Sequence, residues 1–385
     1  MPAHAILSAS GSKRWLACPP SALLETKFPD TSSEAAREGT FAHYVAEKIL
    51  SNYLSKEPLI ENQLLSPLRG REFYSEDLIG YVREYTDACI EKINAAKAAD
   101  TMAVAFIEEK LDFSKWVPKG FGTGDCVIIS DGILEIIDLK YGKGVPVSAE
   151  GNTQMQLYAL GAIDAYNMLY DFDLVRMTIV QPRNGGVSQQ EKSVKELLEW
   201  ACDVVQPTAA RAIKGEGELC AGDHCQFCRA ALKCKTYSDY CMEIAKLEFR
   251  GANLLDDEDI VLVLERVDHL VSYAKKIKEF ALGEALNGKK WTGFKIVEGK
   301  SRRVYSDDSK VADTLKTAGY KTDQIFKPKE LLGLTEMQKL LTKKKFDTLL
   351  SDLITKPAGK PALVPATDKR PEYNPVEADF KNLME

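Results

Sequence analysis

Apolar residues recur at helical spacing in five segments of the chain. In residues 31–50, "TSSEAAREGTFAHYVAEKIL", they stand at positions 42, 45, 46, 49 and 50, behind a Ser/Thr-rich start with acidic residues in its first turn. This combination is typical of an amphipathic helix and its N-terminus. The same reasoning predicts helices in residues 75–99, 152–170 and 194–215, and a long amphipathic helix in residues 259–286.

Four shorter segments are rich in β-branched residues and are bounded by turn residues, which predicts strands. They are "MAVAFIEEKLDF", "GTGDCVIIS", "GILEIIDLKY" and "LVRMTIVQP", residues 102–113, 122–130, 132–141 and 174–182. Three strands thus follow the N-terminal helices, and a helix and a fourth strand come next. This order predicts an α/β core in which a mixed central sheet is flanked by helices.

The second and third predicted strands are separated by Asp131-Gly132, and Asp-Gly between two apolar runs is a strong signal for a two-residue hairpin turn. Such a turn pairs Ser130 with Ile133 and places Asp125 directly opposite Asp138. Opposed residues have Cβ atoms about 4.5–5.5 Å apart and point to one face. The middle of that face is apolar, with Val127, Ile129, Leu134 and Ile136, and Lys140 continues it one step beyond Asp138.

Two carboxylates that face each other beside an apolar patch repel and are poorly solvated. A divalent cation would compensate for this, and oxygen ligands suit magnesium or manganese. Lys140 could then help to activate a water or stabilise charge on a phosphate. The alternative is a structural Asp138–Lys140 ion pair at a strand end. Glu109, late in the first strand, could add a third carboxylate, although a solvated glutamate is the simpler expectation.

Bulk composition is that of an ordinary globular protein, with 45% hydrophobic and 28% charged residues among 385. We find no transmembrane run and no secretory signal at the N-terminus, so an intracellular location is expected. The net charge is −6, but residues 271–370 hold 22 Lys and Arg against 12 Asp and Glu, or +10, which leaves −16 elsewhere. That segment could bind a polyanion, or its charges could belong to solvated helix faces.

Five of the nine cysteines lie between Cys220 and Cys241, and such clustering in an intracellular chain indicates a metal or cluster site. Cys225, Cys228 and Cys234 have the spacing C-x2-C-x5-C. Spacing alone allows zinc or iron–sulfur, with Cys220, His224 or Cys241 as a fourth ligand, or simply reduced cysteines on a helical hairpin.

The motifs around Asp125 and Asp138 resemble those of the PD-(D/E)XK nuclease superfamily. Gly122 to Asp125 resembles its G-x-x-D motif, and Asp138-Leu139-Lys140 resembles its D-x-K motif. Two flanking pairs are similar to the RecB-type branch: Gly39 and His43 to its G-x-x-x-H helix, and Gln154 and Tyr158 to its Q-x-x-x-Y helix. All four stand in the family order, and the resemblance covers roughly residues 8–240.

The resemblance implies roles for these residues. Asp125, Asp138, the backbone carbonyl of Leu139 and His43 would bind Mg²⁺ or Mn²⁺. Lys140 would position and help to activate the attacking water, while Gln154 and Tyr158 would orient Lys140 or contact the nucleic-acid backbone. Iron–sulfur forms of these nucleases, among them CRISPR-associated and helicase–nuclease proteins, add one cysteine before the core. Cys18 occupies that place, which implies a structural 4Fe–4S cluster on Cys18, Cys225, Cys228 and Cys234, with zinc as the alternative.

The expected protein is therefore a metal-dependent deoxyribonuclease, with an exonuclease favoured. We expect a helical region (1–100), a nuclease core with the cysteine segment (101–245), a basic helical and hairpin α+β extension (246–355) and a flexible tail (356–385). The extension would hold DNA through the cations at its densest points: Lys289, Lys290, Lys300, Arg302, Arg303, Lys343, Lys344 and Lys345.

The whole layout also resembles a phage- and prophage-borne family of RecB-like proteins. This implies DNA replication or recombination in the cytoplasm of a bacterial host, with single-strand-binding, annealing or helicase proteins as partners. Two alternatives stay open: a non-catalytic DNA-binding recombination accessory protein, and a zinc-stabilised interaction module.

Overall fold

The structure is a computed structural model. It describes residues 5–29, 33–143, 146–184, 186–243, 257–299, 304–327, 330–331, 334–341, 343–355, 362–365 and 372–373. The chain divides into two compact units, Met1–Leu270 and Val271–Glu385. Within the described residues, no helix is long and apolar enough to cross a membrane.

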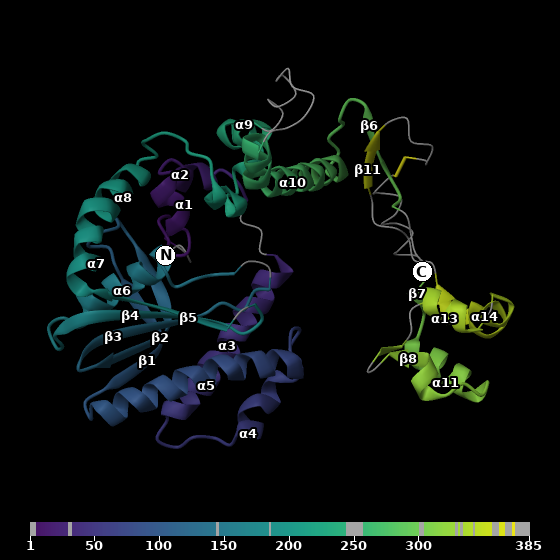
Figure 1. Ribbon diagram of the computed structural model, residues 1–385, viewed down its shortest axis with the longest axis horizontal. Helices are drawn as coiled ribbons and strands as arrows, with labels where there is room; N and C mark the ends of the chain where they lie inside the picture. The colour runs from purple at the N-terminus through teal and green to yellow at the C-terminus, as the bar shows by residue number, and fades with distance from the viewer. Residues whose placement is uncertain are drawn as a thin grey trace. The chain divides into compact units, whose positions relative to one another are not determined.

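A five-stranded mixed sheet forms the centre of the first unit (Figure 1). Its order follows the sequence: β1 (Val104–Asp112), β2 (Phe121–Ser130), β3 (Gly132–Leu139), β4 (Phe172–Gln181) and β5 (Gly186–Ser193). Neighbours are antiparallel except β3 and β4, which are parallel because α6 (Thr153–Tyr166) crosses between them. The predicted mixed α/β architecture is confirmed.

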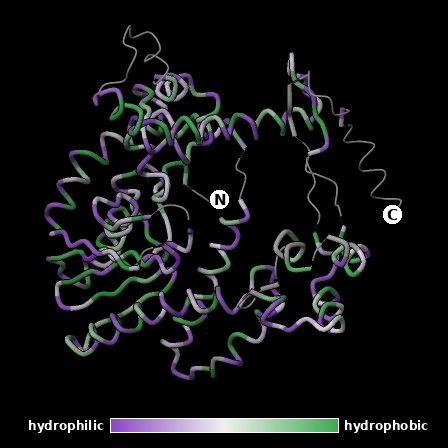
Figure 2. The backbone as a smooth tube through the Cα atoms, turned by 45° about the vertical axis from the view of Figure 1, so that its right-hand side comes forward, coloured by the Kyte–Doolittle hydropathy of each residue, from purple (hydrophilic) through white to green (hydrophobic). Residues whose placement is uncertain are grey.

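Helices cover both faces of this sheet and enclose two hydrophobic cores. On one face, α6 packs against β1 to β4 and contacts α1 (Ser12–Ala17) and α7 (Val194–Trp200). On the other face lie α3 (Glu34–Leu54) and α5 (Glu76–Ala99), which pack against each other. The predicted apolar stripe of α3 is confirmed, since Ala42, Val45, Ala46 and Leu50 are buried there. Green and purple alternate along the helices in Figure 2, as expected for amphipathic helices.

The predicted register of the β2–β3 hairpin is also confirmed. Ser130 pairs with Ile133 and Cys126 with Ile137, so the next position brings Asp125 opposite Asp138. Gly132 has a φ of +71°, a left-handed conformation that glycine adopts without a steric penalty. The hairpin turn therefore fixes which residues of the two strands face each other.

Strand β5 was not predicted. It pairs with β4 at the edge of the sheet, and its sequence, "GVSQQEKS", has no apolar alternation, because all of its residues are exposed or half-buried. An edge strand with few core contacts carries a weak periodic signal, so its existence depends on the hydrogen bonds that β4 offers.

The remainder of the first unit is helical. It comprises α2 (Ser21–Glu25), α4 (Glu61–Leu65), η1 (Ser66–Leu68), the π-helical turn η2 (Ala201–Val205), α8 (Gln206–Ala212), η3 (Asp223–Phe227), η4 (Ala231–Lys233) and α9 (Lys235–Met242). The long helix α10 (Asp257–Leu286) begins in the first unit and ends in the second. It corresponds to the amphipathic helix predicted in residues 259–286.

The second unit contains small two-stranded sheets and short helices. Its elements are β6 (Phe294–Val297), β7 (Val304–Tyr305), α11 (Asp308–Thr317), α12 (Thr322–Ile325), β8 (Phe326–Lys327), β9 (Glu330–Leu331), α13 (Leu334–Leu341), α14 (Lys343–Leu350), η6 (Ser351–Leu353), β10 (Ile354–Thr355) and β11 (Ala362–Pro365). A small core forms around Val311, Leu315, Ile325 and Phe346.

The hairpin predicted in residues 291–305 is wrong. Its two strands exist as β6 and β7, but β6 pairs with β11 and β7 pairs with β10. Both partners come from near the C-terminal end, so part of the expected flexible tail, at 362–365, is a paired strand. Two short strands with no strong turn signal between them do not specify each other as partners.

Candidate active site

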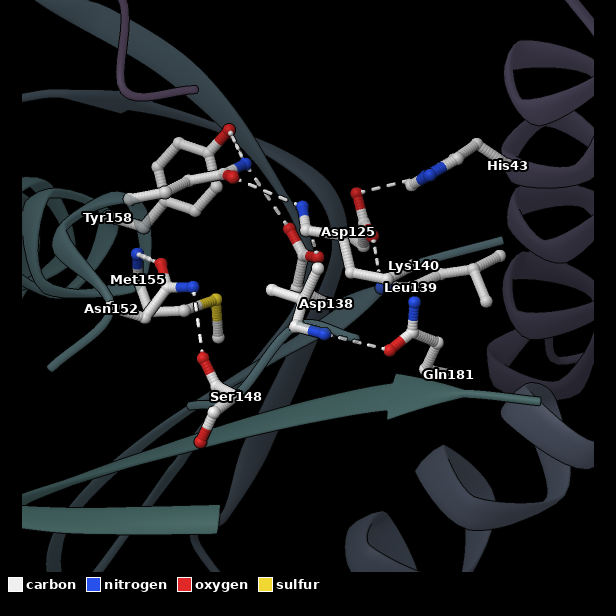
Figure 3. Close-up of polar contacts among 12 residues, drawn as sticks. His43, Asp125, Asp138, Leu139, Lys140, Ser148, Asn152, Met155, Tyr158 and Gln181 are labelled. Atoms are coloured by element: carbon white, nitrogen blue, oxygen red, sulfur yellow. Dashed lines mark hydrogen bonds and ion pairs between the residues drawn. The ribbon is translucent and has the colours of Figure 1, made fainter. Parts of the chain in front are cut away.

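The two opposed aspartates lie next to the apolar part of the sheet, Asp125 within β2 and Asp138 near the end of β3. Both are buried. Asp125 is fixed by a backbone contact, since the N–H of Leu139 donates to its Oδ2 at 2.7 Å. Figure 3 shows Asp125 between His43 on one side and Asp138 on the other. The hairpin register thus brings together the two carboxylates that the sequence analysis singled out.

His43 reaches this pair from helix α3, on the opposite face of the sheet from α6. Its Nδ1 lies 3.2 Å from Oδ1 of Asp125. Burial works against the charged imidazole, but the negative charges of Asp125 and Asp138 outweigh it and raise the pKa of His43 to about 9. The contact places an imidazole nitrogen beside the carboxylates, and its role as a metal ligand stays a prediction.

Glu108 on β1 is a third carboxylate of the site, and it is not among the residues predicted from the sequence. Ligand atoms of His43, Glu108 and Asp125 all lie within 4.8 Å of one another. Burial, followed by the charge of Asp125, raises the pKa of Glu108 to about 7. The neighbouring Glu109, considered in its place, instead accepts a hydrogen bond from Tyr166 Oη at 2.9 Å.

The position of Glu108 depends on the pairing of β1 with β2. Ile107 pairs with Cys126 and Glu109 with Gly124, so Glu108 stands at the position opposite Asp125. Its φ of +52° is left-handed, which a non-glycine residue adopts only at a steric cost of about 1–2 kcal/mol. Residues 113–120 connect these strands and include Pro118 and Gly120. A connection of this length, unlike a two-residue turn, does not fix the register from sequence.

Lys140 completes the arrangement on the α6 side. Its Nζ lies 2.7 Å from Oδ2 of Asp138 and donates to Oε1 of Gln154 at 3.1 Å. Burial raises the pKa of Asp138, and the charge of Lys140 opposes that shift. The Oδ2 atom is nevertheless buried without a well-aligned hydrogen bond from any described residue.

Gln154 and Tyr158 hold the lysine in place from α6. Gln154 Nε2 donates to Tyr158 Oη at 3.1 Å and approaches Oδ1 of Asp138 at 3.4 Å. The glycine of the G-x-x-D motif makes room for this helix, because a Cβ at Gly122 would stand 2.6 Å from Cε1 of Tyr158. All four sequence motifs therefore meet at one place.

A second polar contact ties the first half of α3 to the ends of β3 and β4. Arg183, just after β4, donates to Glu38 Oε1 at 3.0 Å, and the Tyr141 hydroxyl donates to the same oxygen at 3.3 Å. The guanidinium also lies 4.5 Å from the centroid of the Tyr141 ring. Parallel neighbours end at the same edge of a sheet. The contacts of Arg183 with Glu38 and Tyr141, called the Arg183 clamp below, therefore hold the helix of His43 against the end of β3, which Lys140 directly follows.

The donor set fits a hard divalent cation. His43, Glu108 and Asp125 bring potential ligand atoms within 4.8 Å of one another. Asp138 stands opposite Asp125 beside this group, and Lys140 contacts its Oδ2 at 2.7 Å. Oxygen with a single nitrogen ligand is the chemistry of magnesium and manganese sites. The role of the Leu139 backbone carbonyl as a metal ligand stays a prediction.

The structure brings Cys18 to the cysteine segment across about 200 residues of sequence. The N–H of Cys220 donates to Sγ of Cys18 at 3.4 Å, and the N–H of Arg229 donates to Oε1 of Glu25 at 2.8 Å. Burial raises the pKa of Cys18, and it raises the pKa of Cys225 and of Cys228 to about 11. Cys225 lies close enough to Cys18 and Cys234 for their charges to interact.

His224, Cys241 and Cys220, the alternative fourth ligands, make other contacts or are exposed. His224 Nε2 lies 2.9 Å from the Cys220 carbonyl oxygen, and Cys241 is buried beside Tyr237. Cys220 itself is exposed. Cys89 and Cys126 are buried, as expected for small apolar residues, whereas Cys202 is exposed.

The predicted DNA-holding cations are only partly within the described residues. Lys289 and Lys290 are exposed, and Nζ of Lys289 stands 4.2 Å from the ring centroid of Trp291. Lys345 is exposed on α14, where Lys343 and Lys344 are described by their backbone alone. Lys300, Arg302 and Arg303 lie outside the described residues.

Comparison with known proteins assigns a family. The family model described as "Protein of unknown function (DUF2800)" matches residues 4–371, almost the whole chain. The chain belongs to this family. Among solved structures, a "Putative exonuclease" from Eubacterium rectale is similar with a TM-score of 0.32 and 14% identity, over 55% of this chain and 82% of that one.

The crystal structure of SSO0001 is similar with a TM-score of 0.23 and 13% identity, over 51% of this chain and 96% of that one. At such TM-scores neither likeness supports an inference about this DUF2800 chain.

Proposed function

We propose that this protein is a metal-dependent nuclease that hydrolyses DNA phosphodiester bonds. The observation that carries the proposal is the cluster of His43, Glu108 and Asp125, with Asp138 and Lys140 directly beside it. Glu108, Asp125 and Asp138 come from three adjacent strands, and Lys140 contacts the last of them at 2.7 Å. The resemblance to the RecB-type branch of the PD-(D/E)XK superfamily, stated above for the four motifs, supports the same reaction.

Each residue has a role in the proposed reaction. His43, Glu108, Asp125 and Asp138 would hold one or two Mg²⁺ or Mn²⁺ ions. A bound ion would neutralise charge on the phosphate and lower the pKa of a water molecule. Lys140 would orient the attacking water and donate to a phosphate oxygen as negative charge develops. Gln154 would keep the Nζ of Lys140 aimed at that position, through the contact at 3.1 Å.

The decisive experiment is digestion of end-labelled single- and double-stranded DNA with Mg²⁺ or Mn²⁺. We expect the wild type to release labelled products and Asp138→Ala to release none above background. Equal release by both proteins, or none by the wild type with either metal, would contradict the proposal. The pattern of products distinguishes an exonuclease, which the resemblance favours, from an endonuclease.

We propose in addition that Cys18, Cys225, Cys228 and Cys234 hold a structural 4Fe–4S cluster. The N–H donated to Cys18 Sγ supports this, because such hydrogen bonds are typical of cluster thiolates. Zinc would require sulfurs about 3.8 Å apart, as follows from a tetrahedral ion with bonds of about 2.3 Å. Among the described residues, no three cysteines lie that close together. A cluster, whose thiolates bind different iron atoms, accommodates wider spacing.

Anaerobic purification tests the cluster. We expect a brown protein with iron and acid-labile sulfide, and we expect Cys18→Ser to lose both. Cys202→Ser is the matched control, since this cysteine is exposed and belongs to η2, outside the C-x2-C-x5-C segment. A colourless protein that contains zinc, with Cys18→Ser unchanged in metal content, would establish the zinc alternative. A role in bacteriophage replication or recombination, with its partners, stays a prediction from the sequence resemblance.

A further inference from the structure

One face of α3 carries an aromatic and basic ridge that the proposed reaction does not use. Arg37, Phe41, Tyr44 and Lys48 follow one another at intervals of four, three and four residues. This spacing places them on a single side of the helix. The segment before α5 adds Arg71 from across the ridge. The ridge thus joins aromatic rings to cations on a surface.

Tyr44 is the centre of these contacts. Its ring stacks on Phe41, with centroids 6.5 Å apart and planes at 29°. Nζ of Lys48 lies 5.1 Å from the Tyr44 centroid, and the guanidinium carbon of Arg71 lies 6.0 Å from it. Cations at such distances interact favourably with the ring, and long side chains that are exposed can move aside for a ligand.

Ordinary packing accounts for part of the ridge but not for Tyr44. Phe41 and Phe73 pack against the buried core between α3, α5 and the sheet. Tyr44, in contrast, is 36% exposed and is not among the residues that pack there. Arg37 and Lys48 have carboxylate partners in Glu72 and Glu47. Arg71 is exposed and makes no ion pair with any described residue. The exposed ring of Tyr44 and the unpaired cation of Arg71 therefore lie side by side.

The ridge lies next to the candidate metal ligands. Tyr44 directly follows His43, so on a helix it stands about 1.5 Å further along the axis and about 100° around it. His43 itself contacts Asp125 at 3.2 Å. A nucleic-acid strand with one phosphate at the carboxylate group would have a neighbouring nucleotide within reach of Tyr44. An exposed ring binds the face of an unpaired base, since bases in a duplex already stack on each other.

We propose that Tyr44 and Arg71 form a binding site for one unpaired nucleotide of single-stranded DNA, beside the metal group. Tyr44 stacks on the base, and Arg71 contacts the phosphate that follows. This assignment rests on the proposed nuclease function, because it takes the substrate from that reaction. It adds the substrate class: the protein acts on a single strand or on a frayed end.

The test measures binding apart from cleavage. The full chain carrying Asp138→Ala is titrated in EDTA into fluorescent oligothymidylate, and into an abasic oligonucleotide of the same length. Tyr44→Ala is compared with Tyr44→Phe and with Tyr53→Ala in that background. Tyr53 is a matched control on the same helix, with a similar exposed fraction of 38%. Its position nine residues later puts it about 13 Å away on the opposite side.

We expect Tyr44→Ala to bind oligothymidylate about fivefold to a hundredfold more weakly, the range known for base stacking. Binding of the abasic strand should not change, and Tyr44→Phe and Tyr53→Ala should bind like the parent. Arg71→Ala should weaken binding to both strands and lower the slope of log affinity against log salt by about 0.7.

Three outcomes would overturn the site: no effect of Tyr44→Ala on oligothymidylate, an equal effect on the abasic strand, or an equal effect of Tyr53→Ala. Preference of the parent for duplex over single-stranded DNA would do the same. Hydrolysis is measured separately on the chain with Asp138 intact. A protein that cleaves DNA but binds independently of Tyr44 refutes this site alone, and one that binds through Tyr44 but never cleaves refutes the nuclease.

Discussion

Strand β3 carries two buried carboxylates three residues apart, and they have opposite surroundings. Glu135 faces α5, and Asp138 stands at the end of the strand beside Asp125. Their side chains are 7% and 3% exposed, so burial does not distinguish them. What distinguishes them is the balance of charge around each.

Glu135 is fully compensated. Lys92 contacts its Oε1 at 2.5 Å, Thr178 donates to the same atom at 2.9 Å, and Arg176 lies 3.6 Å from Oε2. Arg176 also contacts Glu191 at 2.8 Å, so two cations and a hydroxyl balance the charge of two carboxylates. Such a network has no capacity for a further cation, and it is what a structural role requires.

Asp138 belongs to a group with too few cations. Glu108, Asp125 and Asp138 share Lys140 and His43, so full ionisation leaves an excess of negative charge in a buried place. Like charges at short range destabilise a fold unless an ion compensates for them. The comparison teaches that a buried carboxylate indicates function when its neighbourhood leaves charge uncompensated, and that burial alone does not.

The largest expected difference between the two regions is in catalysis. Lys140→Ala removes the group that would orient water and stabilise charge, and we expect DNA hydrolysis to fall about a thousandfold, equivalent to about 4 kcal/mol. Lys92→Ala removes the lysine of the other network and should leave the rate within a few-fold of the wild type. Initial rates on end-labelled DNA with Mn²⁺ measure both. Equal losses in the two variants would remove the distinction drawn here.

The second difference is in stability, where the two regions should respond with opposite signs. Glu135→Gln breaks a buried, paired network, so we expect the free energy of unfolding to fall by about 3 kcal/mol. Asp138→Asn relieves repulsion in the metal-free site and should raise it by about 1 kcal/mol. Urea unfolding in EDTA gives both values. Destabilisation by Asp138→Asn would mean that Lys140 compensates Asp138 as completely as Lys92 does Glu135.

A smaller effect is expected from the Arg183 clamp, which positions His43. Arg183→Ala frees the first half of α3 from Tyr141 and β4, and we expect Mn²⁺ to bind about tenfold more weakly, as is common for residues that orient ligands. Arg176→Ala, an arginine of the compensated network, is the control and should leave the affinity unchanged. Isothermal titration calorimetry measures both, and unchanged affinity in Arg183→Ala would make the Arg183 clamp purely structural.

The smallest expected effect is a pH dependence confined to the uncompensated group. Glu108 has a raised pKa of about 7, and His43 one of about 9. The folded protein therefore binds more protons than the unfolded chain, so stability in EDTA should fall as pH rises from about 4.5 to 9.

Glu108 should account for a fall in the free energy of unfolding on the order of 1 kcal/mol over this pH range, because its carboxyl is partly screened by water. Glu108→Gln should flatten the curve below pH 7. Saturating Mn²⁺ should reverse the trend, since metal ligands must lose their protons. Urea unfolding across this pH range measures the wild type, Glu108→Gln and the Mn²⁺-bound protein. An identical pH dependence for wild type and Glu108→Gln would show that the pKa of Glu108 is not raised.

Local patterns were enough to predict the β2–β3 hairpin. The Asp131-Gly132 turn and the alternation of apolar residues fix the pairing of Ser130 with Ile133 and so the opposition of Asp125 and Asp138. Helix periodicity likewise placed Gln154 and Tyr158 on one side of α6. Turn residues and periodicity act over a few residues, so a short segment of sequence is enough to predict these features.

Long-range partners were not predictable in this way. Nothing local says that β6 pairs with β11, because several short strands offer similar edges. Glu108 was missed for the same reason: its place opposite Asp125 depends on the β1–β2 register across an eight-residue connection, which does not fix that register. Strand β5 exists because β4 presents unpaired backbone groups at the sheet edge.

The sequence by itself determined the two aspartates, the lysine one pleat beyond them and the cysteine spacing, since each depends on residues close together in the chain. Tertiary structure decided the rest of the site. It brought His43 and Glu108 to Asp125 and set Cys18 against Cys220. It also left Tyr44 exposed next to His43. The physical reason is that packing of α3 and β1 around one sheet, rather than any local preference, sets these distances.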